Sequence, residues 1–186
     1  MDRRKSLGLL GAGALFIANS SFSSIKSTNK IPTSQENFKG AFEKRWKGVR
    51  QHTFEVFDSM PGDQFDFKPT EDVMSFGNLF CHIGWSLDIY KEVLNGKSKV
   101  DKLETNDKNT VFGYLQSRFD GFEEAMDSVI GERLYLTDHH FSKTEPWMNF
   151  SNYDVLMLSY NHAVHHKGQA TTYLRLKGIV PPRYRF

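Results

Sequence analysis

Two histidines near the C-terminal end of the sequence have the spacing of a metal-binding pair. His162 and His166 lie four residues apart in the stretch NHAVHHKGQ, which covers residues 161–169. On a helix this spacing places both imidazoles on one face, with Cβ atoms roughly 6 Å apart. Both rings can then reach one ion at about 2.0–2.1 Å. The glutamate that follows the first histidine of zinc proteases is missing, so the sequence does not indicate a protease.

A third ligand has to come from another helix, and His82 is the candidate. It is the only histidine in the apolar segment that precedes Asn95. A lone pair such as His162 and His166 is also typical of surface or core histidines that bind nothing, and that alternative stays open. Burial favours the metal, because two buried neutral imidazoles need polar partners and a shared ion satisfies them. The stripe predicted to face inward with them contains Val155, Ser159, His162, His166, Gln169 and Tyr173.

Three polar residues of the same stretch are predicted to support the site. His165 is rotated from His166 by about 100° around the helix, so we expect it at the edge of the pocket. Direct ligation by His165 is the alternative. Asn161 and Gln169 are expected to lie near the same pocket or behind the ligands.

The other histidines and the cysteine receive less specific interpretations. His139 and His140 lie in an irregular segment and are predicted to be solvated, and His52 is predicted to be exposed. Cys81 is the only cysteine, which excludes an intramolecular disulfide and a cysteine-based metal site. We interpret it as a small buried residue, with a reactive thiol beside the metal as the alternative.

Four segments with helical periodicity are predicted to position these residues. Ser75 is a candidate N-cap, and Ser151 with Asp154 resembles a capping box. Gly178 stands where a helix-ending glycine belongs. The predicted helices cover residues 35–59, 75–95, 110–130 and 151–177.

The same periodicity predicts which residues face the core. The inward faces are predicted to carry Phe38, Phe42, Trp46, Val49, Thr53 and Val56 on the first helix, Leu79, Ile83, Ser86, Tyr90 and Val93 on the second, and Phe112, Leu115, Phe119, Phe122, Met126 and Val129 on the third. Four such helices predict an all-α fold, an up-and-down four-helix bundle. Residues 132–149 lack periodicity, so a long irregular connection is expected before the fourth helix, with short extended pieces at 134–136 and 147–150. It is long enough to lie across the mouth of the bundle.

The N-terminal residues read as an export signal. Residues 1–23 combine a short basic start with an apolar run from Leu7 to Ala18 and small polar residues after it. Arg3 and Arg4 before this run resemble a twin-arginine signal, and a Sec-type signal or an uncleaved anchor is the alternative. We therefore expect export, to the periplasm, and no stable membrane insertion after cleavage. Residues 24–34 are predicted to be a linker and residues 35–186 the folded domain.

The composition and charge of the chain indicate which kinds of partner to expect. Hydrophobic residues make up 39% of the chain, which is typical of a globular domain. The formal net charge of +2 arises in the predicted signal, and basic and acidic residues balance in the rest. A balanced domain has no basic footprint, so no nucleic-acid partner is expected.

These residues together resemble the DinB/YfiT superfamily of bacterial four-helix bundles. The segment NHAVHHKGQATTYLRLKGIVPP is similar to its helix-four motif, and FGNLFCHIGWSLDIY is similar to its helix-two segment. The preceding FDFKPTEDVMSFG is similar to its proline-containing loop, and the likeness spans residues 36–184. The resemblance implies a divalent metal bound by His82, His162 and His166. It also admits a homodimer.

Function remains open between classes at this stage. An open site of three imidazoles would suit a metal-dependent hydrolase or a thiol or group transferase that acts on a small molecule. The alternatives are a non-catalytic bundle that the metal stabilises, related to ligand binding or stress, and a bundle with unmetallated histidines. Zinc or nickel is favoured as the single divalent ion, and iron or copper would also suit imidazole ligands. Trp85 and Trp147 are candidates for lining the pocket, with core packing as the alternative.

Overall fold

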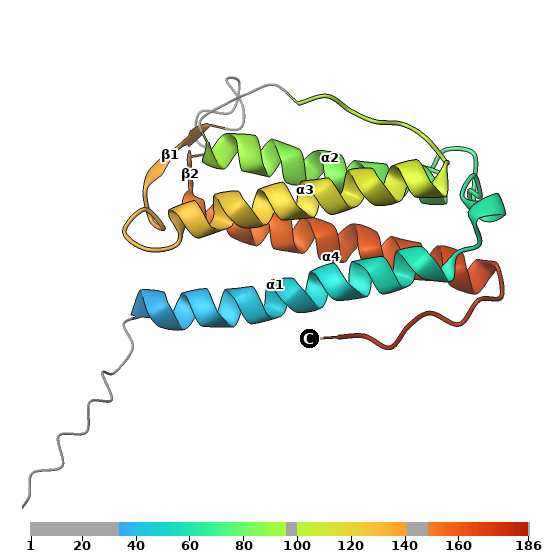
Figure 1. Cartoon of the computed structure of the whole chain (residues 1–186), viewed down its shortest axis with the longest axis horizontal. Coiled ribbons are helices and arrows are strands. Elements are labelled where there is room, and N and C mark those ends of the chain that lie inside the picture. Colours follow the sequence, from blue (N-terminus) through green and yellow to red (C-terminus); the bar gives the residue numbers. More distant parts are fainter. Residues whose placement is uncertain (1–33, 96–99, 141–148, 186) are drawn as a thin grey trace, which may run out of the picture. The chain divides into compact units, whose positions relative to one another are not determined.

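Four helices form the folded part of the chain. The structure is a computed structural model that describes residues 34–95, 100–140 and 149–185. The helices are α1 (Ser34–Ser59), α2 (Phe76–Leu94), α3 (Lys108–Val129) and α4 (Asn152–Leu176), and a short 3-10 helix, η1 (Gly62–Gln64), follows α1 (Figure 1). The four-helix bundle is therefore confirmed. The predicted export signal, the linker up to residue 33 and Trp147 lie outside the described residues.

The predicted signals at the helix ends are present in the structure. The Ser75 hydroxyl accepts a hydrogen bond from the backbone of Asn78 at 3.3 Å. At the start of α4, Ser151 Oγ accepts from the Asp154 backbone at 3.2 Å, and the Asp154 carboxylate accepts from the Ser151 backbone at 2.9 Å. Gly178 has a φ of 73°, a left-handed conformation that favours glycine. These contacts fix where α2 begins and where α4 begins and ends.

Two of the helices, α2 and α3, run in the same direction, which differs from a strict up-and-down order (Figure 1). A Cβ added to Gly84 would meet Tyr114, and one turn later Asp88 lies 3.5 Å from Arg118 Nε. The connection makes this order possible. A 19-residue helix such as α2 is about 28 Å long, and an extended chain with the length of residues 95–107 reaches roughly 40 Å. The chain can therefore cross the whole bundle before α3 begins.

The core of the bundle is largely aromatic. The largest side chains with less than 2% exposure include Phe57, Phe65, Phe76, Phe80, Phe119 and Phe122. The predicted inward faces of α1, α2 and α3 are buried or half-buried, with one exception on α3. Phe112 is 40% exposed, so its predicted burial is wrong. It lies at the rim of the core, where its ring contacts Phe54 and Phe57 at 5.5 and 6.1 Å.

A short β-ribbon stands in the connection before α4. Strand β1 (Thr137–His140) pairs antiparallel with β2 (Asn149–Ser151). The extended piece predicted at 134–136 is displaced, because the carbonyls of Leu134 and Leu136 accept hydrogen bonds from the first residues of α4. His139 and His140 belong to β1 rather than to an irregular loop, and their side chains are outside the described part.

The chain returns along α1 after α4 ends. Residues 179–185, here the C-terminal segment, lie beside this helix in Figure 1. Pro182 O is 3.4 Å from His52 Nε2, and the Tyr184 ring packs edge-on against the His52 ring at 5.8 Å. His52 is only 3% exposed, so its predicted exposure is wrong. Helical periodicity placed His52 at the surface of α1 but carried no information about a segment that covers that surface.

None of the helices in the described ranges is both long enough and apolar enough to cross a membrane.

Candidate metal centre

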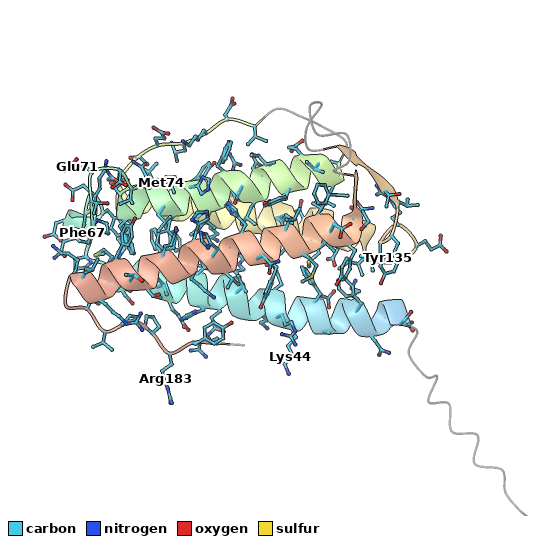
Figure 2. The ribbon with its side chains drawn as sticks, turned by 180° about the vertical axis from the view of Figure 1, so that it is seen from behind. Lys44, Phe67, Glu71, Met74, Tyr135 and Arg183 are labelled. Carbon is cyan, nitrogen blue, oxygen red and sulfur yellow. The ribbon has the colours of Figure 1, made fainter. Side chains whose placement is uncertain are left out.

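The three predicted ligand histidines come together between α2 and α4. His82 comes from α2, and His162 and His166 come from successive turns of α4. The ring centroids are 5.0 Å apart for His82 and His162, 4.6 Å for His82 and His166, and 4.4 Å for His162 and His166. One nitrogen from each ring lies within 4.8 Å of the other two. Figure 2 shows the bundle from the side on which α4 lies in front.

Gln169 fixes the orientation of the His166 ring. Its side-chain oxygen lies 2.8 Å from His166 Nδ1, so this nitrogen donates its proton to the amide. The amide nitrogen of Gln169 lies 3.2 Å from His165 Nε2 and donates to it. His166 Nε2 is consequently left with a free lone pair, and it points at His162 Nε2, 3.1 Å away. A hydrogen bond to the far nitrogen is the usual way in which proteins orient a metal-binding imidazole.

The donor set fits a divalent ion. Tetrahedral coordination with bonds of about 2.0–2.1 Å places the ligand nitrogens roughly 3.3 Å apart. The 3.1 Å separation between the Nε2 atoms of His162 and His166 is close to that value. Because the three ligand nitrogens all lie within 4.8 Å of one another, the nitrogen of His82 would have to move closer to the other two by about 1.5 Å at most. Imidazole nitrogens suit zinc, nickel, copper and iron, and the geometry does not choose among them.

Burial keeps the three imidazoles neutral. Desolvation, with smaller contributions from the charges of His166 and Lys102, lowers the pKa of His82 from 6.5 to about 4. Desolvation and the neighbouring histidines lower the pKa of His162 to about 4 as well. Burial also lowers the pKa of His166, against the opposing effect of the hydrogen bond that its Nδ1 donates to Gln169. A neutral imidazole has a lone pair to offer, so all three rings can bind a metal at neutral pH.

The predicted supporting residues lie on the open side of the site. His165 and Gln169 are exposed, and the His165 ring lies 4.8 Å from the His166 ring. Gln169, which the helical stripe placed inside, is exposed because it lies where that stripe meets the surface. Asn161 is exposed on α4, and neither of the hydrogen bonds described above for His166 involves it.

Aromatic residues of α2 form walls beside the histidines. Trp85 is half-buried, and its ring lies 5.6 Å from the ring of His82. The Tyr90 ring lies 6.1 Å from the ring of His162. Of the two interpretations of Trp85, its contact with His82 supports a position in the wall of the site. Helical spacing alone could have indicated this contact, because the two residues lie three apart.

Sequence reasoning missed a cation that lies near the site. Lys102 belongs to the connection between α2 and α3, and its ammonium lies 6.0 Å from the centre of the Trp85 ring. It also pairs with Glu104 at 2.5 Å. No periodic signal marks a loop residue of this kind, because its place depends on the path of the crossing connection.

Cys81 is buried against the connection between α2 and α3. It is 1% exposed, and its thiol lies 3.7 Å from the carbonyl oxygen of Thr105. Burial raises the pKa of the thiol, which disfavours the reactive thiolate. The interpretation as a small buried residue is confirmed.

The fold and the site define a class of protein, a four-helix bundle with a histidine site able to hold a metal ion between two helices. Comparison with known families gives the same answer. Residues 34–186 match the DinB family, and the chain belongs to this family. The predicted resemblance is thereby confirmed.

Solved structures of similar fold come from three bacteria. A DinB-like protein from Bacillus cereus is similar with a TM-score of 0.66 and 19% identity, over 77% of this chain and 95% of the other. The DinB-like protein YjoA from Bacillus subtilis gives 0.64 and 22%, over 78% and 98%. A conserved protein from Enterococcus faecalis gives 0.58 and 17%, over 75% and 95%. Identities this low show the fold alone. No curated protein matches the chain.

Proposed function

We propose that the protein is a metal-dependent enzyme, a hydrolase or a thiol or group transferase that acts on a small molecule. The observation that carries this proposal is the composition of the histidine site. Within the described residues, the cluster able to hold an ion consists of three imidazoles, with no carboxylate or thiolate in it. Three protein ligands leave coordination positions open, which is the pattern of catalytic rather than structural zinc sites.

A bound ion would supply a Lewis acid and would lower the pKa of a coordinated water or thiol. The residues of the chain supply the rest. His82, His162 and His166 would hold the ion through neutral nitrogens, and Gln169 keeps His166 in the required tautomer. No carboxylate of the described residues contributes to the pKa shifts of these three rings.

His165 is the candidate for moving a proton. It is exposed beside the site, and its Nε2 accepts a hydrogen bond from Gln169. A histidine at such a place can act as a general acid or base toward a bound substrate. The Trp85 and Tyr90 rings give the site apolar walls, which suits a small organic substrate better than a polymer.

The test begins with metal content. The purified protein should contain about one divalent ion per chain by inductively coupled plasma mass spectrometry, and His82→Ala and His166→Ala should each lose it. His165→Ala is the matched control, because it removes an adjacent imidazole from the same helix and should keep the ion. Turnover is then measured with p-nitrophenyl esters and with chlorodinitrobenzene plus a small thiol.

The two functional classes give different results in this experiment. An enzyme should turn over one of these substrates only when the ion is present, and His165→Ala should slow it by about 10²-fold or more. If the ion binds and removing it lowers only the melting temperature, the protein is a metal-stabilised binding protein. If the wild type takes up neither zinc nor nickel, the histidines have no role with metal.

We also propose that the protein is exported through its N-terminal residues. The paired Arg3 and Arg4 before an apolar run support this proposal. Fractionation of cells should find the protein in the periplasm, and Arg4→Lys together with Arg3→Lys should retain it inside if the twin-arginine route is used. Export of the double variant would indicate a Sec-type signal instead, and retention of the wild type would contradict export.

A further inference from the structure

A groove between α1 and α4 opens on the side of α4 that faces away from the metal centre. Its cavity of about 250 Å³ is walled by Phe38 and Phe42 of α1 and by Tyr153 and Tyr160 of α4. Tyr160 and His162 are two residues apart, about 200° around the helix, so the groove and the histidine site use different faces of α4.

The walls of the groove are aromatic rings that support one another. The Phe38 ring lies 5.2 Å from that of Tyr153, and the Phe42 ring lies 6.3 Å from that of Tyr160. Phe42 is 4% exposed and forms the floor, whereas the other three rings are half-buried and form the sides. A flat apolar molecule can therefore stack on rings that are already held in place.

A single cation, Arg45, stands at the rim of this apolar groove. In the part of the chain that the structure describes, its guanidinium has no acidic partner. The neighbouring positions three and four residues away on α1 are Ala41, Phe42, Gly48 and Val49, which offer no carboxylate. By contrast, Arg50 of the same helix pairs with Asp120 and Glu123.

Charge and shape together identify an occupant. We propose that the groove binds a small aromatic carboxylate, with its ring between the aromatic walls and its carboxylate on the guanidinium of Arg45. Arginine presents a planar set of donors that matches a carboxylate. The cavity suits one ring or two fused rings, because 250 Å³ is slightly below the usual range for drug-sized ligands. The small side chain of Ala41 leaves the entrance to the groove open.

The probes are indole-3-acetate and indole-3-acetamide, which share a ring system and differ in charge. Their dissociation constants are measured on the full chain by ligand-observed NMR. We expect the acetate to bind in the millimolar range or better and about fivefold more tightly than the amide, as one solvent-accessible charged hydrogen bond provides. Arg45→Gln should reduce that ratio to about one. Ala41→Phe should weaken both probes at least about tenfold by filling the entrance.

Two controls locate the binding. Lys44→Gln removes a positive charge from the adjacent position, and Lys44 points away from the bundle in Figure 2, so the ratio should not change. His166→Ala removes a histidine of the metal site, and both probes should still bind. Circular dichroism melting shows whether each variant is folded, and Arg45→Gln decides the question alone if Ala41→Phe does not fold.

Several outcomes would overturn the proposal. It fails if neither probe shows saturable binding, or if the acetate preference survives Arg45→Gln. It also fails if binding vanishes in His166→Ala, which would place it at the metal site. Sedimentation velocity then measures whether the chain is a monomer or a dimer. A dimer that Ala41→Phe dissociates would show that the groove is covered by a second copy of the chain instead.

Discussion

The lowered pKa values of the metal-site histidines predict that the metal-free protein loses stability as the pH falls from 7 to 5. In the folded state His82 and His162 have pKa values of about 4, whereas an unfolded histidine has 6.5. Between these values the unfolded chain binds more protons than the folded chain, so acid favours unfolding. The stabilising effect of neutral histidines is complete above pH 6.5 and declines until about pH 4.

The size of the effect follows from the two shifts. One group with these pKa values changes the free energy of unfolding by about 2 kcal/mol between pH 7 and pH 5. Two independent groups would give about twice that amount. Partial solvent access screens the interaction, and part of the shift of His162 comes from the charge of His82 rather than from burial. We therefore expect a total loss of about 2 kcal/mol from this pair.

Urea unfolding at pH 7, 6 and 5 in the presence of a chelator measures this loss. His162→Gln removes one of the two titrating rings, so the loss from this pair should fall by about half. Asn161→Ala removes an exposed, non-ionisable side chain of the same helix and should leave the loss unchanged. The reasoning is refuted if wild type and His162→Gln lose the same free energy. A metal-free protein that is more stable at pH 5 than at pH 7 would also contradict it.

Two further predictions concern packing. Gly77→Ala should lower the free energy of unfolding by about 1–3 kcal/mol, because the added Cβ would lie 3.0 Å from the Asn106 Cα and the Thr105 carbonyl oxygen. Gly113→Ala has open space around its Cβ and should raise it by about 0.5–1 kcal/mol; equal effects in urea titrations would refute this contrast. Lys167 is 2% exposed, its ammonium donates no hydrogen bond within the described residues, and burial lowers its pKa. Lys167→Met should therefore raise stability by about 1 kcal/mol, and a lower melting temperature would show that the contact with the Tyr184 ring matters more.

The helices could be predicted from sequence because their signals are local. Periodicity and the caps at Ser75, Ser151 and Gly178 placed the ends of the four helices within two residues. The His162 and His166 pair is also local, since four residues on a helix determine its geometry. Bringing His82 to that pair required only that α2 and α4 pack side by side.

The parts that could not be predicted depend on where irregular segments run. Burial of His52 results from the C-terminal segment, and the position of Lys102 results from the crossing connection. The parallel order of α2 and α3 has the same cause, because a connection long enough to cross the bundle permits both directions. Amphipathic faces specify what a helix buries, and they do not specify which neighbour or loop covers it.

The surroundings of the metal site come partly from helices and partly from the connection between α2 and α3, and the sequences of these two parts can change independently. The ligands belong to two helices that pack against each other, whereas Lys102 lies in the connection outside both helices. Substitutions in that loop can alter the charge at the entrance while the three histidines stay in place. Bundles of this kind can thus acquire new selectivity by exchanging one surface loop, and a library randomised over residues 100–104 would be the natural starting point for redesign.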